Sequence, residues 1–257
     1  MILQALKEYY DRKAADPESG IAPEGWEWKE IPFIVVISKT GDFLRIEDTR
    51  EGDGKKKRGK AFLVPQGVKK TSGVAANLLW DTAGYALGCI NTTLLSDQKA
   101  QKAKARVPEQ KKAFIDRIKT ELPNSVSVVP LLGFMDSTNL DVLEQSPCWG
   151  EIYSANPLVS FRIEGERELI CRSNDVISYL DTMSGARIAD GICLVSGKRD
   201  QVCELHTSIK GVYGAQTSGA NIVSFNLAPF RSYAKNQGLN APVGEKSMFA
   251  DRKSTRL

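Results

Sequence analysis

Residues 31–47 read IPFIVVISKTGDFLRIE, and this stretch decides the fold. Its first half is rich in Ile and Val, whose branched side chains favour a buried β-strand. The sequence Lys-Thr-Gly-Asp at 39–42 predicts a tight turn, after which residues 43–47 return as a second strand. The chain is therefore predicted to be organised around a β-hairpin.

Hydrophobic periodicity predicts helices and further strands on both sides of this hairpin. Residues 2–14 carry apolar side chains at helical spacing, and the apolar run 74–87 suits a buried helix. Pro108 is predicted to end one helical segment, so that 109–122 forms a helix of its own. The other predicted elements are a loop and strand at 123–134, helices at 136–143, 175–183 and 230–237, strands at 61–64, 158–165 and 221–226, and a hairpin at 192–205. Together they predict an α+β fold, in which a mixed or antiparallel sheet with hairpins is flanked by helices.

At 257 residues the chain has room for one large domain or two small ones. Two X-Pro pairs near 145–157 flank a short connector. They predict an N-terminal α+β region over 1–150 and a second α+β lobe over 151–250. The last residues, 251–257, read DRKSTRL and look like translated adaptor sequence, so no fold is predicted for them.

Composition indicates an ordinary globular protein, with 42% hydrophobic and 26% charged residues. No apolar run approaches the roughly 20 residues that a bilayer-spanning helix needs. The 5 cysteines are odd in number and scattered, which is typical of reduced thiols. We therefore expect a cytoplasmic protein with no membrane contact.

The strongest charge pattern lies directly after the hairpin. The net charge is only +4, but residues 54–70 contain no acidic side chain. The basic side chains there are Lys55, Lys56, Lys57, Arg58, Lys60, Lys69 and Lys70. Thr71 or Ser72 stands at the expected start of the 74–87 helix, where free N–H groups and the helix dipole attract phosphate. Residues 52–60, here called the basic loop, are thus predicted to lie at a sheet edge and to bind nucleic acid. If about four or five side chains neutralise phosphates, log affinity falls against log salt with a slope of about −4.

Other readings of these charges stay open. A run of like charge is also typical of a solvated loop, and the second basic region, 96–121, is predicted to be mainly a solvated helix face. One functional alternative is a metal-dependent nuclease that processes nucleic acid. Another is a protein scaffold whose basic loops meet acidic partner surfaces.

The sequence offers little for catalysis. His206 is the only histidine, and no GxSxG motif surrounds a serine. Cys193, Cys203 and His206 make three potential zinc ligands, whereas a structural zinc site normally has four. Phosphate-binding loops of the GxxxxGK[ST] and GxGxxG kinds are absent. No catalytic residue, metal or cofactor is therefore expected, and the protein is not expected to be an enzyme.

Three blocks of the sequence resemble a known family. They are MILQALKEYY at 1–10, IEDTREGDGKKKRGKAFLVPQGVKKTSGVAANLLWDTAGYALG at 46–88, and LHTSIKGVYGAQTSGANIVSFNLAPFRSYAKNQGLNAPVGE at 205–245. They are similar to the N-terminal part of the large subunit of the type I-C CRISPR surveillance complex, Cascade. Members of that family continue past this length into a helical region, so the resemblance implies an N-terminal fragment.

The resemblance implies a non-catalytic subunit of an RNA-guided antiviral complex. Guide pairing then reads the target, while this protein recognises the short protospacer-adjacent motif on duplex DNA and promotes R-loop formation. The implied partners are the guide CRISPR RNA, target double-stranded DNA, the backbone and guide-end-capping subunits of Cascade, and a recruited helicase-nuclease.

Site residues follow from the same resemblance. The resemblance implies that DNA phosphates are bound by Lys55, Lys56, Lys57, Arg58 and Lys60. It implies that the groove edges of the motif are contacted by Lys69, Lys70, Thr71 and Ser72, and that Asn77 supports these contacts. Many relatives have asparagine in place of Ser72; a hydroxyl makes fewer hydrogen bonds than an amide, which implies a looser motif preference. The loop 206–221 is implied to face guide RNA or another subunit through Lys210, Gln216, Thr217, Ser218 and Asn221. Its glycines either admit a sugar-phosphate backbone or serve turns.

Overall fold

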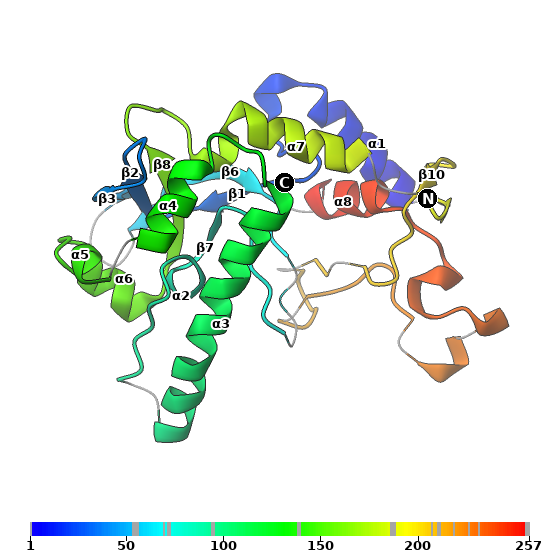
Figure 1. The fold of residues 1–257 in the computed structure, drawn as a ribbon. Helices are drawn as coiled ribbons and strands as arrows, with labels where there is room; N and C mark the ends of the chain where they lie inside the picture. The colour runs from blue at the N-terminus through cyan, green and yellow to red at the C-terminus, as the bar shows by residue number, and fades with distance from the viewer. Residues whose placement is uncertain are drawn as a thin grey trace. The chain divides into compact units, whose positions relative to one another are not determined.

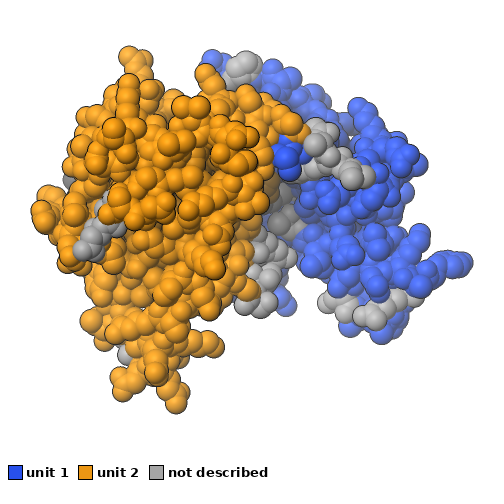
Figure 2. Space-filling model, in the orientation of Figure 1, with its two compact units in different colours: residues 1–24, 183–257 blue, residues 25–182 orange. Residues whose placement is uncertain are grey.

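The computed structural model divides the chain into two compact units (Figure 2). Unit 2 comprises residues 25–182, and unit 1 joins residues 1–24 to residues 183–257. The predicted regions 1–150 and 151–250 do not coincide with these units, because 151–182 belongs to unit 2. The residues described are 2–52, 57–68, 70, 73–93, 96–137, 140–185, 189–206, 208–209, 212–217, 219–225, 227–230 and 232–254.

A mixed four-stranded sheet forms the centre of unit 2 (Figure 1). Its strands are β2 (Phe33–Ile37), β3 (Phe43–Asp48), β7 (Trp80–Thr82) and β8 (Leu158–Ile163), in the order β3-β2-β8-β7. β2 runs antiparallel to β3 and parallel to β8, whereas β7 is antiparallel to β8. All residues of β2 are buried, so both faces of the sheet are covered at this central strand. The predicted hairpin and the predicted α+β fold are both confirmed.

The turn of the hairpin depends on a glycine. Gly41 has a φ of +94°, and a Cβ there would lie 2.6 Å from the carbonyl oxygen of Pro130. Glycine is therefore required twice, by the left-handed backbone and by the close approach of another segment. The turn closes with a 2.8 Å hydrogen bond from the Ser38 N–H to the Asp42 carbonyl oxygen.

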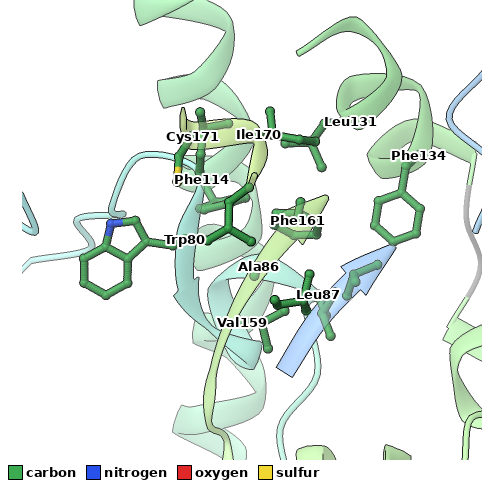
Figure 3. Packing of buried hydrophobic residues seen from close by; sticks show 14 of the residues in the cluster. Trp80, Ala86, Leu87, Phe114, Leu131, Phe134, Val159, Phe161, Ile170 and Cys171 are labelled. Atoms are coloured by element: carbon green, nitrogen blue, oxygen red, sulfur yellow. The ribbon is translucent and has the colours of Figure 1, made fainter. Parts of the chain in front are cut away.

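Helices cover the sheet through aromatic packing (Figure 3). Phe161 of β8 lies between Phe114 of α3 (Asp97–Glu121) and Phe134 of α4 (Val129–Ser137), with both ring-centroid distances 6.1 Å. Each ring is buried, and burying one such side chain contributes roughly 1.5–3 kcal/mol. The core of unit 2 therefore joins β8 to helices from distant parts of the sequence.

Besides this sheet, the described residues form three two-stranded ladders. β1 (Trp26–Glu30) pairs antiparallel with β6 (Ala61–Pro65), and β4 (Arg50–Glu51) pairs with β5 (Arg58–Gly59). In unit 1, β9 (Gly191–Ile192) pairs with β10 (Arg199–Asp200), which confirms a hairpin within 192–205 but with much shorter strands. β6 confirms the strand predicted at 61–64, whereas its partner β1 was not predicted.

The helix predicted at 74–87 is wrong for most of its length. Only α2 (Ala83–Ala86) is helical, and β7 precedes it. Asp81, inside the run, accepts hydrogen bonds from backbone N–H groups of its neighbours, and Leu79 has a φ of 64°. Leu78 and Leu79 are nonetheless fully buried. The apolar run therefore reflected burial, not helical periodicity.

Two other predictions in unit 2 need correction. Pro108 lies inside α3, which continues through it as one helix, and the Pro108 side chain is exposed. Residues 129–134, expected within a loop and strand, belong to α4, whose Leu131 and Phe134 pack into the core. Tertiary packing outweighed local signals at both places. The remaining helices are α5 (Leu140–Glu144), α6 (Trp149–Ala155), the 3-10 helix η3 (Ile170–Arg172) and α7 (Asn174–Gly185), while β8 confirms the strand predicted at 158–165.

Unit 1 pairs the two ends of the described chain. α1 (Ile2–Ala14) confirms the predicted first helix, and its Tyr10 ring meets Phe249 of α8 (Glu245–Ser254) edge to face, with centroids 5.7 Å apart. The strand predicted at 221–226 is not found in its described part, 221–225; an isolated bridge between Ile209 and Ala220 ends just before it. The short 3-10 helices of this unit are η1 (Pro17–Ser19), η4 (Ala228–Phe230), η5 (Ser232–Ala234) and η6 (Gln237–Asn240), and the last three replace the helix predicted at 230–237. No helix in the described ranges is long and apolar enough to cross a membrane.

Candidate nucleic-acid interface

The basic loop is carried by the β4–β5 ladder. In this ladder Arg50 is paired with Gly59, and Glu51 is paired with Arg58. A Cβ on Gly59 would lie 2.6 Å from the Pro32 nitrogen and 2.8 Å from the Ile31 carbonyl carbon, both backbone atoms. The glycine in the KKKRGK sequence therefore lets the base of the loop lie directly against the segment that precedes β2.

Three of the predicted cations are displayed on this base. Lys57, Arg58 and Lys60 are exposed. The Arg58 side chain is 81% exposed and its guanidinium is 3.9 Å from Glu30, so this ion pair is weak. Within the described ranges, Lys57 and Lys60 form no ion pair. Lys57 and Lys60 can therefore meet a polyanion without first breaking a salt bridge among the described residues, and Arg58 has only its weak pair with Glu30 to break.

Arg50 anchors the ladder, a role that the sequence reasoning missed. Its guanidinium donates to Asp48 at 2.6 Å and to Glu151 of α6, and it lies 4.7 Å from the centroid of the Phe33 ring. Its side chain is only 16% exposed. Hydrogen bonds with Asp48 and Glu151 raise the Arg50 pKa, and the bond from Arg50 lowers the pKa of Asp48. The Arg50 guanidinium is thus occupied by partners within the protein.

Lys70 is held in the same way by a buried carboxylate. Its Nζ lies 2.5 and 2.8 Å from the two oxygens of Asp81, whose side chain is 1% exposed, and 3.8 Å from the centroid of the Tyr85 ring. Asp81 also accepts the backbone N–H groups of Asn77 at 2.8 Å and Thr82 at 2.7 Å. The structure therefore gives Lys70 an internal partner, and the phosphate or groove contact expected of it stays a prediction.

Asn77 is a positioning residue. It is buried, and its Oδ1 accepts the Val68 N–H at 3.0 Å. Glu27 accepts the neighbouring Gly67 N–H at 2.9 Å, and the Trp80 indole donates to the Pro65 carbonyl oxygen at 2.8 Å. These bonds fix the start of the segment 68–77, which contains Lys69, Thr71 and Ser72. The support that Asn77 was expected to give to groove contacts stays a prediction.

Two arginines of α3 fix the other end of that segment. Arg106 donates to the Gly73 carbonyl oxygen at 3.0 Å, and Arg117 donates to that of Ala76 at 2.5 Å. Arg117 also bonds Glu121 at 2.7 Å. Part of the 96–121 charge, expected to be mainly solvated, is therefore used to hold backbone. Nothing in the local sequence marks these two arginines, because their acceptors are carbonyl groups of a distant loop.

Residues 73–79 are not helical, and α2 begins only after Thr82, so a helix that starts at Thr71 or Ser72 and continues to residue 87 is not found among the described residues. The prediction that a helix dipole attracts phosphate there is therefore wrong. The predicted site residues Lys55, Lys56, Lys69, Thr71, Ser72, Lys210 and Ser218 lie outside the described residues.

The family comparison agrees with the resemblance at the coarse level. The family model described as CRISPR-associated protein (Cas_Csd1) matches residues 6–254. The chain belongs to this CRISPR-associated family. No curated protein matches the chain. The Csd1 match covers both units, including the ladder that carries the basic loop.

The second predicted contact region of this Csd1-family chain lies in unit 1. Thr217 and Asn221 are exposed, and the Gln216 carbonyl oxygen accepts the Gly219 N–H at 2.9 Å in a turn. Gly219 has a φ of +112°, so at least this glycine serves the turn. A contact of the loop with RNA or another subunit stays a prediction.

The zinc-ligand alternative gains no geometric support in the part of the chain that is described. No group of three or more His, Cys, Asp or Glu residues lies together there in a way that could hold a metal ion. His206 is buried, which lowers the pKa of its imidazole, and its Nε2 has no hydrogen-bond partner among the described residues. Cys193 donates to the Ser247 hydroxyl at 3.3 Å, which is a structural contact.

Proposed function

We propose that this Csd1-family protein acts as the large subunit of a type I-C Cascade complex. In this role it contacts the protospacer-adjacent motif on duplex DNA and promotes R-loop formation without catalysis. The observation that carries the proposal is the display of Lys57, Arg58 and Lys60 on a ladder fixed by Gly59. Membership of a CRISPR-associated family supports the antiviral context.

The mechanism assigns different tasks to the two segments. The basic loop supplies side chains that neutralise phosphates, which gives affinity but carries no sequence information. Ser72 is assigned to the edges of base pairs; the described residues on either side of it are anchored, Val68 by a bond to Asn77 and Gly73 by a bond from Arg106 of α3. Anchored flanks support base reading, because sequence discrimination requires hydrogen bonds in a defined geometry.

A mobility-shift series with duplexes that differ only in the adjacent motif tests both tasks. Lys57→Ala/Arg58→Ala should weaken every duplex to a similar degree and make the slope of log affinity against log salt less negative by about 2. Lys198→Ala/Arg199→Ala is the matched control, because that exposed Lys-Arg pair lies on the β9–β10 hairpin of unit 1. Equal effects of the two double variants would refute the assignment to the basic loop.

Ser72→Ala tests the reading task separately. It should change the ranking of the duplexes with little change in their mean affinity. Ser72→Asn should sharpen the ranking, because an amide can both donate and accept toward one base edge. An unaltered ranking in both variants would remove Ser72 from the reading site. Cleavage of a guide precursor in the presence of Mg²⁺ would favour the nuclease alternative instead.

A further inference from the structure

A groove of about 620 Å³ lies beside the basic loop, within unit 2. Lys60, at the end of the basic loop, is part of its lining. The β1–β6 ladder contributes Trp28 and Leu63, and the segment after β8 contributes Arg167 and Arg172. Its volume is within the range of small-molecule sites, roughly 300–1,000 Å³. A nucleic-acid strand bound at Lys60 of the basic loop would therefore lie next to this groove.

An aromatic ring forms part of the groove floor. Trp28 is paired with Leu63, so both side chains lie on the same face of the ladder. Trp26 lies on that face too, but it is 3% exposed and covered by Arg172, whose guanidinium is 4.7 Å from the ring centroid. Trp28 is 50% exposed. The face therefore presents a tryptophan ring to the groove beside an arginine that is already held in place.

The walls carry more positive than negative charge. Five basic and three acidic side chains line the groove. Arg162 is bonded to Glu47 at 2.6 Å, and Arg50 is bonded to Asp48, so both arginines are neutralised. Lys60 and Arg167 make no ion pair within the described ranges. The remaining acidic residues of the lining, Glu51 and Glu168, repel an anion near them, so a phosphate would lie on the side of Lys60 and Arg167.

We propose that this groove binds an unpaired nucleotide, with its base stacked on Trp28 and its phosphates at Lys60 and Arg167. The inference rests on the proposed function, because it extends the path of a duplex held by the basic loop into a single strand. Stacking on an aromatic side chain combined with cations along the backbone is how proteins bind single strands without reading their sequence. The groove thus holds a strand after separation, whereas the basic loop holds the duplex before it.

The test measures the affinity of the full chain for a blunt duplex and for the same duplex with an unpaired DNA or RNA tail, by fluorescence anisotropy. The wild type should bind a tailed duplex more tightly than the blunt one. Trp28→Ala should weaken binding of the tailed duplex about 5- to 100-fold and leave blunt binding unchanged. Trp28→Phe should retain most of the gain, since it keeps an aromatic face. The preferred tail identifies the strand as DNA or RNA.

Two further variants separate stacking from a loss of structure. Arg167→Ala should reduce the gain from the tail and its salt dependence, without altering a thermal melt. Tyr213→Ala, on a fully exposed ring of unit 1, should change nothing. A tail that adds no affinity, or a gain that survives Trp28→Ala, overturns the groove proposal. If the wild type does not bind the blunt duplex at all, the proposed function is overturned instead. The groove proposal is then tested by the affinity of wild type and Trp28→Ala for the unpaired oligonucleotide alone.

Discussion

Two acidic residues of unit 2, Asp81 and Asp175, act as acceptors for several of the protein's own donors. Asp81 receives one ammonium group and two backbone N–H groups, and Asp175 receives hydrogen bonds from Ser125 and Ser127. A buried carboxylate that accepts several hydrogen bonds stabilises loops whose backbone groups are not paired in a β-ladder. Cations near such acids are not available to a ligand, so cation counts in a sequence overestimate the number of binding side chains.

Asp81→Ala should be among the most destabilising single changes in unit 2. It leaves the N–H groups of Asn77 and Thr82 without their acceptor, and a buried donor left unsatisfied costs about 1–3 kcal/mol, whereas the Lys70 ammonium, on a side chain that is 34% exposed, can turn to water. Urea unfolding measures the change. Asp136→Ala is the control, because the 3.8 Å pair of Asp136 with Lys119 is exposed and should contribute less than about 1 kcal/mol. Similar losses in the two variants would contradict this view of Asp81.

Asp175 predicts a specific pH dependence of stability. Burial favours its neutral form, but hydrogen bonds from Ser125, Ser173 and Ser127 outweigh burial and hold the Asp175 pKa well below its ordinary value. The charged form is thus favoured in the folded state. Its contribution is complete above the unfolded pKa of about 3.9 and is lost as the pH falls toward the lower folded-state pKa.

The measurement is the free energy of unfolding between about pH 5 and pH 3. The wild type should lose more stability over this interval than Asp175→Asn, which has no carboxyl to titrate. Asp116→Asn, on the exposed face of α3, should follow the wild-type curve. If Asp175→Asn also follows that curve, the carboxylate is not a stabilising anion.

At the scale of elements, close packing of the β4–β5 ladder decides where the basic loop is displayed. Gly59→Ala would place a methyl group 2.6 Å from backbone that cannot move easily, so we expect a loss of about 1–3 kcal/mol and weaker duplex binding. Gly150→Ala is the control, since a Cβ there meets no atom within 4 Å on α6 and should stabilise by roughly 0.5–1 kcal/mol. Thermal melts and anisotropy together give the result. A Gly59→Ala protein with normal stability would show that the ladder adapts.

At the scale of the whole molecule, the chain leaves unit 1 after residue 24 and returns to it at residue 183. Unit 1 is therefore built from two segments that are far apart in sequence, and the contact of α1 with α8 joins them. A unit with its own core can unfold cooperatively while the rest of the protein stays folded.

Phe249→Ala should test whether unit 1 opens separately. Phe249 is buried against Tyr10, so its removal leaves a cavity and costs about 3–5 kcal/mol within this unit. Amide hydrogen exchange should accelerate in α1 and α8 and stay unchanged in β2 and β8. Phe230→Ala, at a half-exposed ring, should alter neither set. Equal acceleration in β2 would mean that the two units open together.

The local elements of this protein followed from its sequence because each depends on neighbouring residues. The β-branched run and its Gly41 turn specified the β2–β3 hairpin, apolar spacing specified α1, and the position of the clustered lysines predicted an exposed basic loop. The order of residues in three blocks also led to the correct CRISPR-associated family.

Pairings between distant segments were decided only in the tertiary structure. The parallel alignment of β8 with β2, the β1–β6 ladder and the pairing of Lys70 with Asp81 all join residues that no local pattern connects. The run 74–87 shows the reason. Its leucines record burial, but a single carboxylate inside it takes the N–H groups that a helix would use, and which donors reach that carboxylate depends on how the whole unit packs.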